Sequence, residues 1–176
     1  MRPIGIVAAG VALLALNAHG QDTLATARAQ FIDSKGGNVG AATLTEIQSG
    51  QGVLISVELR GLPAGTHAFH IHQTGKCEAP SFKSAGGHFN PLGKHHGFMS
   101  AKGTHAGDLP NIHVGEDGKL TLEVLASGVT LAGSGQTSLF DADGSTLVVH
   151  EGMDDYKTDP AGGAGPRIAC AVIEKP

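Results

Sequence analysis

Tryptophan is absent from this chain of 176 residues, tyrosine occurs once, and aromatic residues make up only 4% of the total. Charged residues are also few, at 16%, with 12 Lys and Arg against 16 Asp and Glu and a formal net charge of −4. Binding along a phosphate backbone requires a basic face, so we expect no nucleic-acid partner. The hydrophobic fraction of 40% is too high for a disordered chain, and the sequence therefore predicts a folded protein.

Long hydrophobic runs are missing outside the first twenty residues. There a single basic residue, Arg2, precedes an apolar stretch of 13 residues from Ile4 to Leu16 and a small, polar end at Gly20. A membrane-spanning helix needs about 20 apolar residues, so we interpret residues 1–20 as a secretory signal peptide and not as a membrane anchor. Cleavage before Gln21 would leave a domain of residues 21–176, and the loss of Arg2 would take the net charge from −4 to −5.

Cysteine is scarce as well, since Cys77 and Cys170 are the two in the chain. In an oxidising, exported environment two cysteines can form one disulfide with none left over. Closing so long a loop would stabilise the fold by roughly 4 to 5 kcal/mol in the chain-entropy model. The alternative is a pair of buried thiols, which is less common outside the cytoplasm.

Glycine, by contrast, is abundant, but its 27 residues follow no three-residue period, which excludes a collagen-like rod. The clearest strand is 53–60, where Val53, Ile55 and Val57 share one face and polar residues alternate with them. Similar patterns occur at 25–32, 39–47, 68–72, 119–125, 137–140, 146–150 and 168–173. Short strands separated by Gly and Asp or Asn turns, without an amphipathic helix, favour a single all-β domain built as an antiparallel sandwich or barrel.

Two long segments, 73–109 and 152–166, lack a strand pattern, and loops of that length in a compact domain are usually functional or disordered. Potential metal ligands are concentrated in the first segment. They are His88, His95, His96, His105 and Asp108. Three imidazoles and one carboxylate form a closed, four-ligand set of the kind that holds structural zinc, which would order the loop.

A second group of histidines lies on expected strands. His70 and His72 are two positions apart and therefore share a face, and His150 ends an apolar run from which it can return to them. A His-x-His pair alone is a weak motif, but imidazole-rich coordination suits copper(II). These patterns do not choose between His95 and His96 as the loop ligand.

Taken together and in order, these segments resemble the copper/zinc superoxide dismutase family over essentially the whole of residues 21–176. The matching segments are His67–His72, Gly86–Pro91, His96–Gly97, His105–Leu109, Leu147–Glu151 and Arg167–Cys170. The resemblance implies an eight-stranded antiparallel Greek-key β-barrel or sandwich, immunoglobulin-like in architecture, with long metal-binding and electrostatic loops.

The resemblance also implies one copper and one zinc per chain. Copper is assigned to His70, His72, His88 and His150. Zinc is assigned to His88, His96, His105 and Asp108, so that His88 bridges both metals and His96 is selected over His95 by its distance of eight positions from His88. His67 matches a structural position, and His95 and His113 are expected to be solvated.

The activity implied is the disproportionation of superoxide to dioxygen and hydrogen peroxide, in which copper cycles between two redox states. His88 and Arg167 are the catalytic residues that the resemblance indicates, for proton handling and for attraction of the anion. Asp154 is expected to link a copper histidine to a zinc histidine. The pair Cys77 and Cys170 is expected to form a disulfide, and Lys157 is a further candidate for guiding superoxide.

The sequence leaves two questions open, the location with the oligomeric state and the choice between two functions. The long interval before His88 and the segment around Asp154 are closest to bacterial exported members, so the periplasm is the expected location, with a monomer or a homodimer equally open. The alternative function is a non-enzymatic copper and zinc module for storage or delivery. Retention of Arg167 and a bridging histidine favours the enzyme, because storage requires neither.

Overall fold

The computed structural model describes residues 24–48 and 51–176, and the expected signal peptide lies outside them. Within these ranges the chain forms nine strands and one short 3-10 helix. They are β1 (Thr26–Asp33), β2 (Asn38–Gln48), β3 (Gly52–Arg60), β4 (Gly65–His67), β5 (Phe69–His72), η1 (Lys83–Ala85), β6 (Ile112–Val114), β7 (Lys119–Ala126), β8 (Thr146–His150) and β9 (Arg167–Glu174). In this part of the chain, no helix has the length and apolar character required to cross a membrane.

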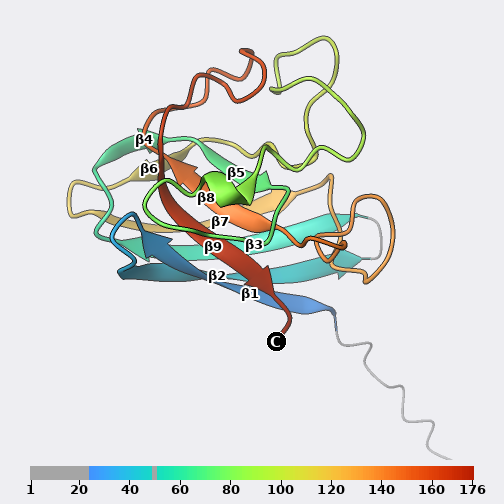
Figure 1. The fold of residues 1–176 in the computed structure, drawn as a ribbon, viewed down its shortest axis with the longest axis horizontal. Coiled ribbons are helices and arrows are strands. Elements are labelled where there is room, and N and C mark those ends of the chain that lie inside the picture. The colour runs from blue at the N-terminus through green and yellow to red at the C-terminus, as the bar shows by residue number, and fades with distance from the viewer. Residues whose placement is uncertain (1–23, 49–50) are drawn as a thin grey trace, which may run out of the picture.

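Seven strands form one antiparallel sheet in the order β5-β8-β9-β1-β2-β3-β7, and β4 pairs with β6 in a second sheet. The larger sheet curls into a half-barrel, and the two long loops stand on the same side of it (Figure 1). The expected all-β, antiparallel class is confirmed. The expected count of eight strands differs from the nine that the described residues contain, because the three-residue strand β6 is additional and for two further local reasons.

The first reason concerns Ala68, where the chain passes between the two sheets. β4 ends at His67 and pairs with β6, whereas β5 begins at Phe69 and pairs with β8. The N–H of Ala68 donates to the carbonyl of Gly152 at 2.8 Å, and its carbonyl accepts from the N–H of His150 at 2.9 Å. The second reason is that residues 137–140 do not form the expected strand. Ser138 makes one isolated bridge, to Thr130, and its hydroxyl bonds to local backbone groups in place of a ladder.

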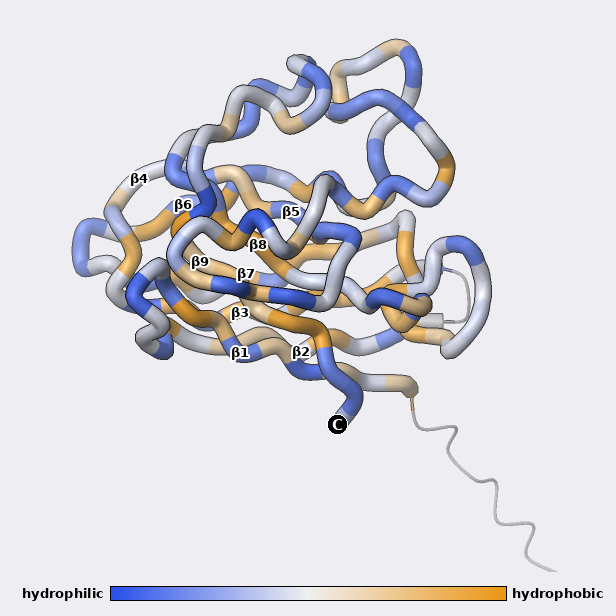
Figure 2. The backbone as a smooth tube through the Cα atoms, viewed as in Figure 1, coloured by the Kyte–Doolittle hydropathy of each residue, from blue (hydrophilic) through white to orange (hydrophobic). Residues whose placement is uncertain are grey.

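The inner face of the sheet holds the hydrophobic core, as the alternation in β3 predicts. Val53, Ile55 and Val57 are buried there, and the rings of Phe31 and Phe69 lie 6.4 Å apart between their centroids. Figure 2 shows apolar residues along the strands, while the two long loops are mainly polar. The strands supply most of the core, and the histidine-rich loop adds Phe89 and Leu109 to it.

The outer faces of β8 and β9 are covered by the loop that follows β5. Phe82 and Ala85 of this loop form a second buried cluster with Val148 of β8 and Cys170 of β9. Cys170 is bonded to Cys77, with the two Cα atoms 5.7 Å apart, so the expected disulfide is confirmed and the alternative of two thiols is excluded. The loop is thus fixed against the sheet face on which His70, His72 and His150 also lie.

Candidate metal centre

Four buried histidines meet between β5, β8 and the covering loop. His70 and His72 come from β5, His150 ends β8, and His88 reaches β5 through a backbone bridge with His72. Each can offer a nitrogen such that all four atoms lie within 4.8 Å of one another. The structure therefore brings together the four residues expected to hold copper.

The nitrogens within this group lack ordinary partners. Nε2 of His72 lies 3.3 Å from Nε2 of His150. Nδ1 of His70 and Nε2 of His88 are buried and accept or donate no hydrogen bond. Burial of unpaired polar atoms is unfavourable and uncommon, so this arrangement fits a site built to be completed by a metal ion.

The opposite nitrogens of three of these rings are held by the protein. Nδ1 of His72 donates to the carbonyl of Gly86 at 3.0 Å, and Nδ1 of His150 donates to that of Gly165 at 3.1 Å. Nε2 of His70 lies 2.8 Å from Oδ2 of Asp154. Acceptors on the far side of a metal-binding imidazole set its tautomer and its orientation, and here they leave the inward nitrogens free.

The second group consists of His88, His96, His105 and Asp108, all buried. Oδ1 of Asp108 lies 2.9 Å from Nδ1 of His88, 3.0 Å from Nδ1 of His96 and 3.3 Å from Nδ1 of His105. Ligand atoms bound to tetrahedral zinc at about 2.0–2.1 Å lie about 3.3 Å apart, a separation that His105 shows and that His88 and His96 approach to within 0.4 Å. The donor set and its spacing therefore fit zinc, as expected.

The carboxylate of Asp108 is oriented by hydrogen bonds to its other oxygen. Oδ2 accepts from the N–H of Gly97 at 2.9 Å, the N–H of His105 at 3.0 Å and the hydroxyl of Thr104 at 2.8 Å. The backbone of Gly97 lies so close to that of Tyr156 that a side chain at position 97 would collide with the carbonyl of Tyr156. Only Oδ1 of Asp108 is left to face the imidazoles.

Two residues connect the groups. His88 belongs to both, with Nδ1 facing Asp108 and Nε2 on the side of the copper histidines. Asp154 places Oδ2 at His70 and Oδ1 2.9 Å from Nε2 of His96. Its backbone is fixed by the side chain of Asn111, which accepts from the N–H of Asp154 at 2.8 Å and donates to its carbonyl at 2.9 Å. Sequence reasoning did not find Asn111, because a lone Asn after a loop carries no distinguishing pattern.

Burial shifts the protonation of these groups. Loss of solvation lowers the pKa of His88 to about 4 and that of His150 to about 3, and it lowers the pKa of His72 well below its ordinary value. Burial also disfavours charge on His96, but its hydrogen bonds to Asp108 and Asp154 outweigh that effect and raise its pKa to about 9. The copper group is consequently a set of neutral imidazoles at neutral pH, the form that binds metal.

A cavity of about 430 Å³ opens onto both groups. It is lined by His72, Gln73, Gly87, His88, Asn90, Lys94, His105, His150, Asp159, Pro160, Ala161 and Arg167. Arg167 is half-buried there, with Nη1 donating to the carbonyl of Phe82 and Nη2 donating to that of Gly86. Its guanidinium stays charged, because the pKa is lowered by burial from a very high ordinary value.

The cavity contains one cation that the sequence did not reveal. Lys94 lines it, whereas Lys157, the expected candidate, is exposed on the neighbouring loop and is not among its lining residues. Lys94 precedes His96 by two positions, and its stem packs over Gly103, where a Cβ would lie 3.0 Å from Cδ of Lys94.

The histidines outside the two groups have other roles. Both ring nitrogens of His67 lie 2.9 Å from a carbonyl oxygen, those of His150 and Pro63, so His67 supports the backbone of His150. The side chain of His95 is 48% exposed, and His113 is exposed and lies near Thr66. These placements agree with the sequence expectations for all three.

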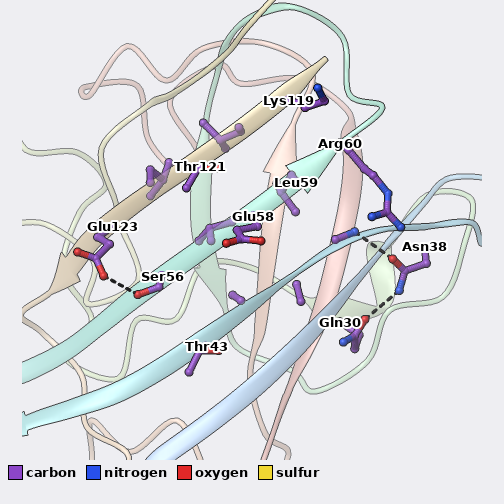
Figure 3. Close-up of a pocket in the computed structure, with 16 residues that line it drawn as sticks. Gln30, Asn38, Thr43, Ser56, Glu58, Leu59, Arg60, Lys119, Thr121 and Glu123 are labelled. Atoms are coloured by element: carbon purple, nitrogen blue, oxygen red, sulfur yellow. Dashed lines mark hydrogen bonds between the residues drawn. The ribbon is translucent and has the colours of Figure 1, made fainter. Parts of the chain in front are cut away.

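A larger hollow, of about 850 Å³, lies on the outer face of β1, β2, β3 and β7 (Figure 3). No histidine or cysteine lines it. Several of its polar side chains bond to one another, with the hydroxyl of Ser56 donating to Glu123 at 2.8 Å and the amide of Asn38 donating to Gln30 at 2.8 Å. The smaller cavity carries the convergent, perturbed groups and is the functional site.

Comparison with known proteins agrees with this geometry. A family model described as copper/zinc superoxide dismutase (SODC) matches residues 38–173. A copper/zinc superoxide dismutase 2 of Aquifex aeolicus is 48% identical over 174 residues, covering 98% of this chain and 99% of that protein. The copper/zinc superoxide dismutase of Caulobacter vibrioides is 47% identical over 141 residues, covering 79% of this chain and 80% of that protein.

Solved structures show the same likeness. A SOD-like protein from Bacillus subtilis superposes with a TM-score of 0.79 at 40% identity, covering 82% of this chain and 96% of that one. The Cu/Zn superoxide dismutase from Brucella abortus superposes with a TM-score of 0.69 at 30% identity, covering 85% of this chain and 99% of that one.

Proposed function

Because this chain belongs to the copper/zinc superoxide dismutase family and disproportionates superoxide to dioxygen and hydrogen peroxide, we propose specific roles for His88, Arg167 and Asp154 in that reaction. The observation that carries the proposal is the position of His88 in both ligand groups, beside a cavity that Arg167 lines. When bound, copper supplies the one-electron oxidation and reduction of superoxide, and zinc fixes the shared ring. The remaining steps depend on the residues of the chain.

His88 handles a proton at Nε2. This nitrogen has no hydrogen-bond partner, whereas Nδ1 is fixed close to Asp108 and His105. A ring held at one nitrogen can take up and release a proton at the other without changing its orientation. Asp108 thereby keeps Nε2 aimed at the cavity through each turnover.

Arg167 attracts and orients the anion. The whole chain carries a net charge of −4, so a small anion meets overall repulsion and depends on local positive charge. Arg167 and Lys94 supply that charge within one cavity, opposed by the single carboxylate of Asp159. A cleft with charged walls can focus the field enough to raise the rate of association despite an unfavourable net charge, an effect for which superoxide dismutase is itself a standard example.

Asp154 positions ligands in both groups through its two oxygens. It touches His70 and His96 from behind, away from the cavity, and does not approach the reacting anion. Partners of this kind orient imidazoles and strengthen their binding to metal.

The competing function is storage or delivery of copper and zinc. Storage does not need a cation over the copper group or a cavity open to it, and both are present here. The test is a disproportionation assay on protein loaded with copper and zinc, together with its Arg167→Ala variant. Turnover well above that of free metal, reduced in the variant with metal content unchanged, supports the enzyme. Loaded protein no more active than free metal would favour storage.

We further propose that the protein is exported, with residues 1–20 as the signal peptide and 21–176 as the mature domain. The disulfide between Cys77 and Cys170 supports an oxidising compartment, and in bacteria, the source of the relatives described above, the periplasm is such a compartment. Mass spectrometry of the mature protein from the periplasmic fraction tests this, since a chain that retains Met1 would contradict it. Sedimentation analysis of the same material decides between a monomer and a homodimer.

A further inference from the structure

Phe82 has an unusual backbone conformation in the loop between the disulfide and His88. Its φ is 53° and its ψ is 22°, in the left-handed region, and it precedes helix η1. Residues with a Cβ seldom adopt this conformation, and it persists only where the surroundings determine it. The side chain of Phe82 is 0% exposed, so the surrounding contacts are available to fix it.

The ring of Phe82 is held against the sheet. It belongs to the buried cluster with Ala85, Val148 and Cys170, which is separate from the main core. Val148 lies on β8, and Cys170 lies on β9 three positions after Arg167. The ring therefore anchors the loop to the strand on which Arg167 is carried.

The carbonyl of Phe82 is held in a position where it binds Arg167. It accepts from Nη1 of Arg167 and also from the N–H of Ala85 at 3.1 Å, while the N–H of Phe82 donates to the carbonyl of Glu78 at 2.9 Å. The carbonyl of Gly86 accepts from Nη2 of the same guanidinium. Two fixed acceptors on a planar fork define both the position and the plane of the group.

We propose that Phe82 is a positioning residue for Arg167. The buried ring holds the left-handed backbone in place, and that backbone presents the carbonyl that fixes the guanidinium at the cavity wall. This inference rests on the role proposed for Arg167 and extends it to a side chain that does not line the cavity. An apolar residue in a polar loop gave no sequence signal for it.

The first test measures how freely Arg167 reacts with phenylglyoxal in the copper- and zinc-loaded protein, read by peptide mass spectrometry. Arg28 and Arg60 are exposed and serve as internal standards. We expect Phe82→Ala to raise the modification rate of Arg167 about fivefold, the shift typical of one lost hydrogen bond. Phe82→Leu should raise the modification rate of Arg167 less. If the alanine variant does not fold, the leucine variant alone tests the proposal.

The matched control is Phe31→Leu, which removes the same ring atoms from the main core. It should lower the melting temperature without altering the modification of Arg167. An unchanged rate in both Phe82 variants, or an equal increase in the control, would overturn the proposal.

A double-mutant cycle then separates this inference from the proposed function. The probe is azide, titrated optically against the loaded protein. Phe82→Leu should weaken azide binding in the parent and have no further effect in an Arg167→Gln background. Equal weakening in both backgrounds would show that Phe82 does not act through Arg167. If Arg167→Gln left azide binding unchanged, the role of Arg167 would fail, whereas the phenylglyoxal result would still decide whether Phe82 holds its side chain.

Discussion

Nε2 of His72 and Nε2 of His150 lie 3.3 Å apart, although the two residues are 78 positions apart in the chain. Neither nitrogen has another hydrogen-bond partner. In each ring it is the opposite nitrogen, Nδ1, that bonds to a backbone carbonyl. Replacing His150 with alanine removes one ligand of copper and none of zinc. We expect His150→Ala protein to retain about one zinc, to lose most of its copper and to lose activity, as measured by elemental analysis and by superoxide turnover.

His113→Ala is the control for this change, since His113 is exposed and lies outside both groups. Copper retained at the level of the parent in His150→Ala would contradict the assignment.

Asp154→Asn should weaken the binding of both metals. The amide is neutral and can accept through only one atom, so it cannot serve His70 and His96 together as the carboxylate does. Losses of about 10- to 100-fold in affinity are usual for such partners, and competition with a chelator measures them. Asp155→Asn removes the same charge from the exposed neighbour and should change neither affinity. A loss confined to one metal would show that the link through Asp154 is not shared.

Lys94→Gln should slow the reaction and flatten its dependence on salt. A cation on the cavity wall accelerates the approach of an anion, and screening weakens that effect as ionic strength rises. The measurement is the rate constant for superoxide across a salt series. Lys157→Gln is the matched control, because it removes an equal charge from the adjacent loop without changing the cavity. If both variants behaved alike, net charge and not position would account for the effect.

Acid should destabilise the metal-free protein. Burial lowers the pKa of His88 to about 4 and that of His150 to about 3, whereas in the unfolded chain both rings protonate near pH 6.5. The unfolded state therefore binds more protons below pH 6.5, and the free energy of unfolding falls by several kcal/mol between about pH 6.5 and pH 4. His96 acts in the opposite sense, because its pKa is raised to about 9, so its contribution is lost as pH rises through that value.

Urea denaturation across this pH range, with and without bound metal, checks the prediction. Bound metal should flatten the acid side of the profile, since an imidazole that holds a metal ion cannot take up a proton at the same nitrogen. A metal-free profile that stayed level from pH 7 to pH 4 would contradict the assigned burial of these rings.

Reduction of the disulfide should lower stability by roughly 4 kcal/mol or somewhat less, because the bridge closes a loop of 93 positions in the unfolded chain. The Cys77→Ser, Cys170→Ser double variant allows the same comparison without a reductant. Denaturant unfolding measures the difference, and an unchanged midpoint in both experiments would contradict a stabilising bridge.

Much of the fold was accessible from the sequence because its strands alternate plainly. Val53–Leu59 shows this well, with inward residues that the structure buries and outward residues that it leaves half-buried or exposed. The prediction of a strand at Thr137–Phe140 was wrong. The hydroxyl of Ser138 bonds to nearby backbone groups, and a pattern of alternating hydrophobicity cannot reveal such bonds, which compete with a strand ladder. The short strand β6 was missed because three residues are too few for a period to be recognised.

The candidate metal ligands were found from residue type and position, the family resemblance divided them between copper and zinc and chose His96 over His95, and the structure brings the two sets together. Residues that act through the backbone were not found in this way. The carbonyl of Phe82 accepts from Arg167, and the carbonyl of Gly86 accepts from both His72 and Arg167. The side chain of Asn111 bonds to the backbone of Asp154. A carbonyl is common to every residue type, so its use leaves no mark on the sequence.

The sharing of His88 has a thermodynamic consequence. A ring that serves two sites cannot be oriented for one without being oriented for the other, so occupancy of one site should change the affinity of its neighbour. Linkage requires the effect to be reciprocal: whatever factor zinc confers on copper, copper confers on zinc. Binding of the two ions is then thermodynamically coupled, and the order in which they are supplied changes the path of assembly but not the final free energy.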